Sequence, residues 1–166
     1  MPADLLTRFN GTCEFLAKLD QSEVMAVVQW ITAIPLTDWP QQGNSTQPLR
    51  PAMPSNAQWF DFEKSTQHLV DEVLRYFPTG IPLQRMLGCI MPGHSIPTHK
   101  DYQCEQWLCR VHIPLITNDK AVMEMDDGAH HMQVGNCYRI NTEANHALRN
   151  DGDTPRIHFM FDVRTP

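Results

Sequence analysis

The sequence predicts a mainly β protein whose second half forms an antiparallel, cupin-like jelly roll. After residue 80, short apolar runs alternate with turn-forming pairs such as Pro92-Gly93 and Gly135-Asn136, and eight such runs follow at short intervals. Many short strands separated by turns are typical of jelly rolls. We expect one domain over residues 1–166, with a helical and loop-rich lead-in over 1–80 and a β core over 81–166.

The lead-in is expected to contain two helices joined by a loop. Ser22 stands shortly before an apolar run, as a helix N-cap would, and this predicts a helix over residues 22–31. Residues 62–77 repeat apolar side chains at helical spacing and end before Gly80, which predicts the second helix. The proline-rich stretch between them predicts a long loop, and residues 36–58 are a candidate lid over a binding site.

The β core is expected to start near residue 82. The predicted strands cover residues 82–91, 95–101, 106–116, 121–125, 130–134, 137–142, 146–150 and 156–163.

Composition disfavours several classes of function. A net charge of −6 provides no basic stripe for a phosphate backbone, so we expect no nucleic-acid partner. No apolar run approaches the roughly 20 residues of a membrane span, and the N-terminus does not resemble a leader, so we expect a cytoplasmic protein without a membrane partner. The five scattered cysteines predict reduced thiols, and they form no pair with the spacing of a zinc site.

A candidate metal site begins with His99 and Asp101. Residues two apart on a strand point to one face, so this pair can present an imidazole and a carboxylate together. Two histidines and one carboxylate are the ligand set of non-haem Fe(II) oxygenases, and His146, at the start of another predicted strand, is the best second histidine. The alternative is that His99 and Asp101 are solvated surface residues, because such a triplet is common.

Two arginines suggest anion binding next to that site. Arg156 lies ten residues after His146, and an arginine facing a sheet interior needs an anion such as a bidentate carboxylate. The alternative partner is a structural carboxylate such as Asp162. Arg110 and His112 share one face of an apolar strand, which implies a second carboxylate; otherwise they are a satisfied core histidine and an arginine that reaches the rim.

These motifs together resemble the aspartyl/asparaginyl β-hydroxylase family, and within it the hydroxylases of free proline. The resemblance covers about residues 82–163 and is carried by MPGHSIPTHKD, CRVHIPLIT, the Gly135 turn, NHALRN and RIHFMFDV. It implies a double-stranded β-helix and a dioxygenase that depends on Fe(II), 2-oxoglutarate and O2. The residues implied to hold Fe(II) are His99, Asp101 and His146.

The resemblance also implies roles for three further residues. Arg156 would bind the C5 carboxylate of 2-oxoglutarate, and Arg110 and His112 would lie near its C1 carboxylate, with a substrate carboxylate as the alternative ligand of Arg110. Aspartyl/asparaginyl β-hydroxylase itself lacks the carboxylate ligand, whereas this chain has Asp101. Because an occupied third position leaves no vacancy for a halide, hydroxylation is expected rather than halogenation.

We therefore expect hydroxylation of a C–H bond in a small amino acid or related substrate, with release of succinate and CO2. The length of the chain favours a small molecule, and a peptidyl Asp, Asn or Pro side chain is the alternative. A non-redox, metal-binding cupin that acts as a sensor or binding module is the competing class, but it has no need for a distal carboxylate anchor.

Several points stay open at this level. Arg85 could hold a substrate carboxylate if it faces inward, or it could lie on the surface. The sequence does not predict the carbon attacked, the stereochemistry or the oligomeric state. Within residues 81–166, the histidines without an assigned role are His94, His130, His131 and His158, of which the last shares strand parity with Arg156.

Overall fold

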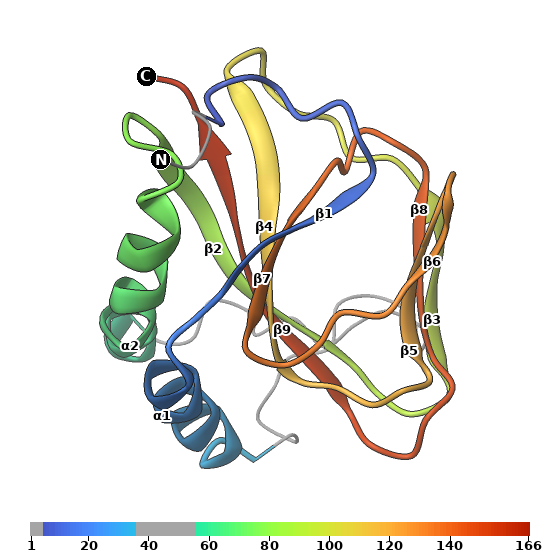
Figure 1. Cartoon of the computed structure of the whole chain (residues 1–166). Helices are drawn as coiled ribbons and strands as arrows, with labels where there is room; N and C mark the ends of the chain where they lie inside the picture. The colour runs from blue at the N-terminus through green and yellow to red at the C-terminus, as the bar shows by residue number, and fades with distance from the viewer. Residues whose placement is uncertain (1–4, 36–55) are drawn as a thin grey trace.

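Two antiparallel sheets face each other in the described residues, 5–35 and 56–166, of this computed structural model. The strand order is β1-β7-β4-β9-β2 in the five-stranded sheet and β3-β8-β5-β6 in the four-stranded sheet. Both helices lie against the outer face of the five-stranded sheet, and the four-stranded sheet lies across from its inner face (Figure 1). This arrangement confirms the predicted jelly roll.

The strand boundaries agree with most of the predicted ranges to within two residues. The five-stranded sheet contains β1 (Cys13–Lys18), β7 (Asn136–Ile140), β4 (Trp107–Ile116), β9 (Arg156–Arg164) and β2 (Ile81–Ile90). The four-stranded sheet contains β3 (His94–His99), β8 (His146–Asn150), β5 (Ala121–Met125) and β6 (Gly128–His130).

Two strands differ from the prediction. β1 is absent from it, because Phe15 is exposed while Ala17 is buried, so the strand has no clean apolar face; its pairing with the distant β7 defines it. The strand predicted over 130–134 is wrong in position. A two-residue turn after β5 pairs Met125 with Gly128, and this pairing starts β6 at Gly128 and ends it at His130.

Both predicted helices exist, with shifted ends. α1 (Gln21–Thr32) is capped by Asp20, whose carboxylate accepts a hydrogen bond from the Ser22 backbone N–H at 2.8 Å, so the cap lies two residues earlier than predicted. α2 (Asn56–Leu74) starts and ends earlier than the predicted 62–77. Residues 36–55 of the candidate lid over 36–58 lie outside the described residues, and residues 56–58 belong to α2.

Side chains alternate between two environments along the central strands. On β4, Val111 and Ile113 are fully buried in a core shared with both helices, whereas Arg110 and His112 point the other way and line a pocket between the sheets. On β9, Ile157, Phe159, Phe161 and Val163 belong to the helix-side core. A second cluster fills part of the space between the sheets: Ile90, Met123, Met125, Met132, Tyr138, Ile140 and Leu148.

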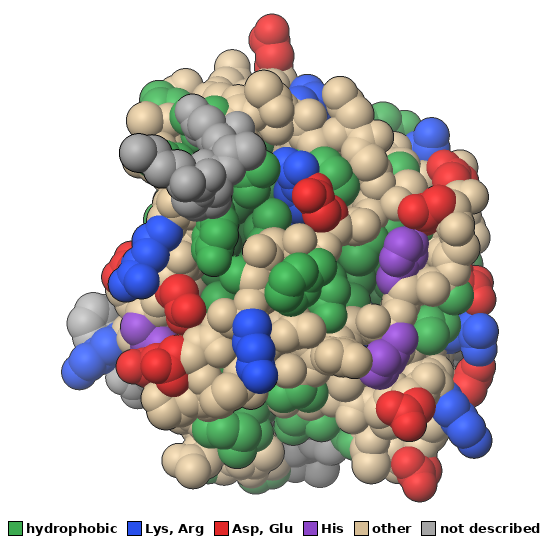
Figure 2. Space-filling view, in the orientation of Figure 1, with side chains coloured by type: hydrophobic (Ala, Val, Ile, Leu, Met, Phe, Trp, Pro, Cys, Tyr) green, Lys and Arg blue, Asp and Glu red, His purple; other side chains and the backbone are tan. Residues whose placement is uncertain are grey.

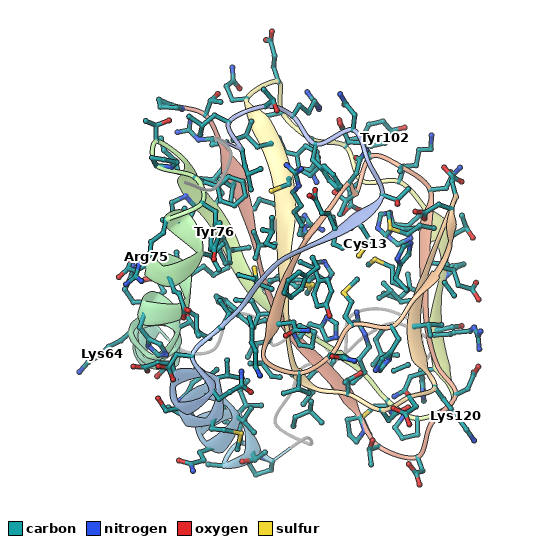
Figure 3. All side chains as sticks on the ribbon, in the orientation of Figure 1. Cys13, Lys64, Arg75, Tyr76, Tyr102 and Lys120 are labelled. Atoms are coloured by element: carbon teal, nitrogen blue, oxygen red, sulfur yellow. The ribbon has the colours of Figure 1, made fainter. Side chains whose placement is uncertain are left out.

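Side chains of both sheets point into the space between them (Figure 3). On the face shown in Figure 2, Lys and Arg side chains are separated by acidic and uncharged groups and form no continuous basic patch. Within residues 5–35 and 56–166, no helix has the length and apolar character needed to cross a membrane.

The helix-side core makes a stability prediction. Ile113 is fully buried, so Ile113→Ala is expected to lower the free energy of unfolding by about 2–5 kcal/mol through lost burial and a residual cavity. Met25 on α1 is 47% exposed, so Met25→Ala serves as the control and should change stability by no more than about 0.5 kcal/mol. Urea unfolding followed by circular dichroism measures both; equal effects would contradict this assignment of the core.

Candidate metal centre

Two neighbouring strands bring the predicted histidines together. β3 and β8 pair in an antiparallel register that sets His99 directly opposite His146, and their ring centroids lie 4.2 Å apart. Asp101 follows two residues after His99, and one ligand atom from each of the three residues lies within 4.8 Å of the others. In the described part of the chain, no other group of three His, Cys, Asp or Glu residues converges in this way.

Backbone carbonyls set the tautomer of both histidines. The Nδ1 of His99 lies 2.8 Å from the Pro97 carbonyl oxygen, and the Nδ1 of His146 lies 3.0 Å from that of Ala144. A carbonyl can only accept, so in the neutral imidazole each Nδ1 carries the proton and each Nε2 keeps its lone pair for a metal. Burial lowers the pKa of His146, which also favours the neutral imidazole.

Asp101 is held from two sides. Its strand ends earlier than predicted, at His99, so Asp101 lies in the loop that follows, where its backbone N–H donates to the Thr142 carbonyl at 2.8 Å. The Thr142 hydroxyl in turn accepts from Gln103 at 3.0 Å. Oδ2 of Asp101 accepts a hydrogen bond from Arg110 Nη1 at 2.6 Å, while Oδ1 of Asp101 lies 3.7 Å from His99 Nε2. The sequence offered no signal for Thr142, whose contacts with this loop depend on tertiary structure.

Arg156 is a buried cation without a carboxylate partner among the described residues. It is 3% exposed, and its guanidinium Nη2 donates to His158 Nδ1 at 3.1 Å. Burial lowers its pKa to about 9, so it stays charged at neutral pH. Burial also raises the pKa of the Cys89 thiol to about 11, so this nearby group supplies no negative charge. A buried charge without a counter-ion is costly, and the site therefore favours an anionic ligand.

Arg110 differs from Arg156, because the protein itself supplies its anions. Its Nε and Nη2 each donate to a different oxygen of the Asp162 carboxylate at 2.9 Å, and its Nη1 donates to Asp101. The second carboxylate implied by the sequence is thus a protein side chain. The pairing of Asp162 with Arg156, considered as an alternative from sequence, does not occur.

Two buried histidines lie beside the arginines. His112 and His158 contact each other edge to face, with ring centroids 5.7 Å apart. Burial lowers the pKa of both well below the ordinary value, and the charge of Arg156 adds to this effect. Among the described residues, His112 Nδ1 and His158 Nε2 have no hydrogen-bond partner. His112 lines the pocket and can therefore meet a bound ligand.

The structure does not bring Arg85 or the remaining histidines into the pocket. Arg85 donates to the Glu63 carbonyl at 3.0 Å and to Gln67 Oε1 at 2.6 Å, both on α2. The Arg85 side chain therefore does not face inward, as it would have to in order to hold a substrate carboxylate. His94 bonds to the Pro92 carbonyl, His130 to Asp127 and His131 to the Ala121 carbonyl.

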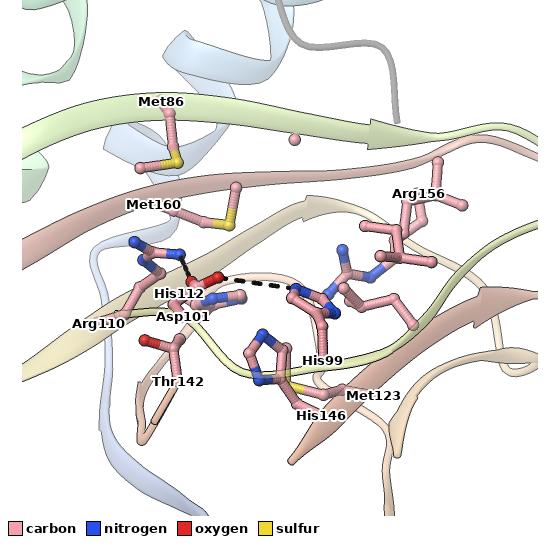
Figure 4. Close-up of a pocket in the computed structure, with 14 residues that line it drawn as sticks. Met86, His99, Asp101, Arg110, His112, Met123, Thr142, His146, Arg156 and Met160 are labelled. Carbon is pink, nitrogen blue, oxygen red and sulfur yellow. Dashed lines mark hydrogen bonds and ion pairs between the residues drawn. The ribbon is translucent and has the colours of Figure 1, made fainter. Parts of the chain in front are cut away.

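The pocket has two distinct ends. Figure 4 shows Arg156 on one side of the His99, Asp101 and His146 group and Arg110 on the other side. The Arg110 end is walled by the thioethers of Met86 and Met160, and Thr142 contributes a hydroxyl. A ligand that lies across the metal-binding residues can therefore meet a positive charge at one end and an apolar wall at the other.

Comparisons with known proteins agree with this geometry. Residues 60–166 match the family model described as aspartyl/asparaginyl beta-hydroxylase. A search of curated proteins finds no match.

Solved structures with low sequence identity share the fold. The collagen prolyl hydroxylase of Paramecium bursaria Chlorella virus-1 superposes with a TM-score of 0.60 at 12% identity, over 95% of this chain and 98% of that one. The Pseudomonas putida prolyl-4-hydroxylase gives 0.58 at 11% identity, over 95% and 94%. The 2-oxoglutarate-dependent epimerase SnoN of nogalamycin biosynthesis gives 0.66 at 11% identity, over 91% and 76%. At these identities the likeness shows the fold alone.

The histidine assignment predicts metal affinity. His146→Ala removes one of three ligands and is expected to weaken Fe(II) binding by more than about 100-fold, the upper range for loss of even an outer-shell partner. His94→Ala is the matched control, because His94 starts the same strand as His99 but lies outside the pocket. Anaerobic isothermal titration calorimetry measures both; unchanged affinity in His146→Ala would remove this residue from the ligand set.

The buried histidines predict a pH dependence of stability in the metal-free protein. Folded His112 and His158 stay neutral because burial lowers the pKa of each, whereas in the unfolded chain each binds a proton near pH 6.5. Stability should therefore fall as pH drops below about 6.5, and these two protons contribute a slope that approaches about 2.7 kcal/mol per pH unit, to which the lowered pKa of His146 adds in the same direction. Urea unfolding between pH 8 and 5 measures it, and a flat profile would contradict the neutral, buried state.

Proposed function

The chain belongs to the aspartyl/asparaginyl β-hydroxylase family, and from this we propose that it hydroxylates a C–H bond of a small amino acid or related substrate, using Fe(II), 2-oxoglutarate and O2. The family makes it a 2-oxoglutarate-dependent oxygenase. The observation that carries the proposal is a buried Arg156, without a carboxylate partner among residues 5–35 and 56–166, in the same pocket as a two-histidine, one-carboxylate set.

The donor groups fit the cofactors. His99, Asp101 and His146 would hold Fe(II), since two neutral imidazoles and one carboxylate leave positions open for other ligands. Bound iron supplies the redox chemistry by which O2 converts 2-oxoglutarate to succinate and CO2 while one oxygen atom enters the substrate C–H bond. Arg156 would pair with the distal carboxylate of 2-oxoglutarate, which supports this reaction over a redox-silent cupin.

The protein's own part is binding and orientation. With one carboxylate fixed by Arg156, 2-oxoglutarate can extend toward the metal ligands in a single direction, and this fixes which end reaches the metal. The unpaired Nδ1 of His112 is the candidate for a hydrogen bond to this cosubstrate. Neutral His158 fixes the guanidinium through its Nδ1. The apolar wall of Met86 and Met160 keeps water from the other end.

A small, partly aliphatic substrate suits that other end. The Met86 and Met160 side chains offer an apolar surface beside the metal ligands, where the reacting C–H bond must lie. The charge of Arg110 is already balanced by Asp101 and Asp162. The aliphatic part of an amino acid such as proline is therefore a suitable occupant.

One observation favours a peptidyl substrate as the alternative. Tyr102 follows Asp101 in sequence and is fully exposed, so its ring is available for a peptide to pack against. Two of the solved structures that share the fold are named as prolyl hydroxylases.

The proposed function is tested by substrate-dependent succinate release. Purified protein with Fe(II), 2-oxoglutarate and O2 is incubated with free amino acids and with the same residues blocked as N-acetyl amides or placed in short peptides. Release stimulated by a free amino acid, with a hydroxylated product by mass spectrometry, supports the proposal. Stimulation by peptides alone selects the alternative, and no stimulation by any member of the panel counts against both.

Arg156 makes a paired prediction for stability and binding. Arg156→Met removes a buried charge, so the ligand-free protein should be at least as stable as the wild type. The affinity for 2-oxoglutarate should fall by about two to three orders of magnitude, because its distal carboxylate loses a buried partner. Urea unfolding and calorimetric titration of the metal-loaded protein measure the two effects. The control is Arg85→Met, because Arg85 on β2 donates its side-chain hydrogen bonds to residues of α2 and lies outside the pocket; this variant should leave 2-oxoglutarate affinity unchanged.

A further inference from the structure

We propose that Arg110 and Asp162 form a buried pair that positions the Asp101 carboxylate for the metal. This inference rests on the proposed function, because it takes Asp101 as a metal ligand. It assigns Arg110 to positioning rather than to binding a cosubstrate or substrate carboxylate, and it gives a role to Asp162.

The pair is built by strand register. Arg110 on β4 and Asp162 on β9 are direct cross-strand partners, and both side chains point to the inner face of the sheet. Asp162 is 2% exposed, and its carboxylate also accepts a hydrogen bond from Trp107 Nε1 at 3.2 Å. Three donors from two residues therefore fix this carboxylate, so that it is a rigid anchor for the guanidinium.

The geometry decides which edge of the guanidinium remains for Asp101. A guanidinium can bind a carboxylate through two parallel hydrogen bonds, which would cover both oxygens. Asp162 occupies such an edge of Arg110, with Nε and Nη2 each 2.9 Å from its two oxygens. Of the N–H groups that remain on Nη1 and Nη2, the one that donates to Asp101 is on Nη1, at 2.6 Å from Oδ2.

This single contact matters because Asp101 lies in a loop. Its backbone has one bond, to the Thr142 carbonyl, so the carboxylate needs a side-chain partner to hold its rotation. With Oδ2 fixed by Arg110, Oδ1 is turned toward His99 Nε2, at 3.7 Å, on the side where the ligand atoms converge. Without Asp162, the guanidinium is free to turn and cover both oxygens of Asp101, in competition with the metal.

A purely structural salt bridge is the alternative, and metal affinity separates the two. We expect Asp162→Asn to weaken Co(II) binding by about 10- to 100-fold, as for other outer-shell partners, and to change the visible d–d spectrum of the bound ion. A structural role alone would lower the melting temperature of the metal-free protein and leave the affinity and spectrum of the folded fraction unchanged. Anaerobic Fe(II) calorimetry repeats the affinity measurement with the proposed metal.

Two further variants keep the test decisive. If Asp162→Asn folds poorly because Arg110 loses its buried partner, Arg110→Gln with Asp162→Asn removes both charges together and should still bind Co(II) more weakly than the wild type. Arg149→Gln is the matched control, because Arg149 also contacts two carboxylates, Glu124 and Asp151, but on the exposed surface. Its Co(II) affinity should equal that of the wild type.

The outcomes separate the inference from the proposed function. Failure of the wild-type protein to bind either ion overturns both. Wild-type binding with unchanged affinity in Asp162→Asn, or with full affinity in the double variant, overturns the positioning role and leaves the metal site intact. Weaker binding and an altered spectrum in both variants, with an unchanged Arg149→Gln control, support the inference.

Discussion

The alternation of side chains along β4 and β9 is the constraint on which the rest of the structure depends. Because successive residues point to opposite faces, one face of these strands packs Val111 and Phe159 against the helices while the other carries charged groups inward. Burying those groups costs free energy, and the apolar face supplies the stability that offsets this cost. A slip of one residue in either strand would exchange the two faces and abolish both the core and the site.

The two inward arginines illustrate opposite uses of buried charge. Arg110 is paired with two carboxylates of the protein itself, Asp101 and Asp162, so it is part of the candidate metal site. Arg156 has no such partner among the described residues, so the folded protein keeps an unfavourable charge that a ligand can relieve. Under the proposed function, the distal carboxylate of 2-oxoglutarate would neutralise this charge, so that relief of the unfavourable burial would contribute to the binding free energy. In the proposed assignment, the residues that hold the metal are therefore distinct from the residue that holds the cosubstrate.

Part of this site could be predicted from the sequence, because local spacing and strand parity carry it. His99, Asp101, His146 and Arg156 converge on one pocket as expected. The partner of each arginine could not be predicted, since it depends on the register between β4 and β9. β1 was not predicted because its apolar residues follow no period. The side chain of Arg85 on β2 points to α2, and its direction could not be predicted because β2 has a register shift between Leu83 and Met86. One domain over the whole chain stays a prediction.

The central claim is that 2-oxoglutarate binds between Arg156 and a metal held by His99, Asp101 and His146. Anaerobic titration of the Fe(II)-loaded protein with 2-oxoglutarate tests it most directly, with visible absorption as the readout. The account predicts a charge-transfer band that saturates at one equivalent in the wild type and is absent at the same concentrations in Arg156→Met. No band from folded, Fe(II)-loaded wild-type protein would contradict the account.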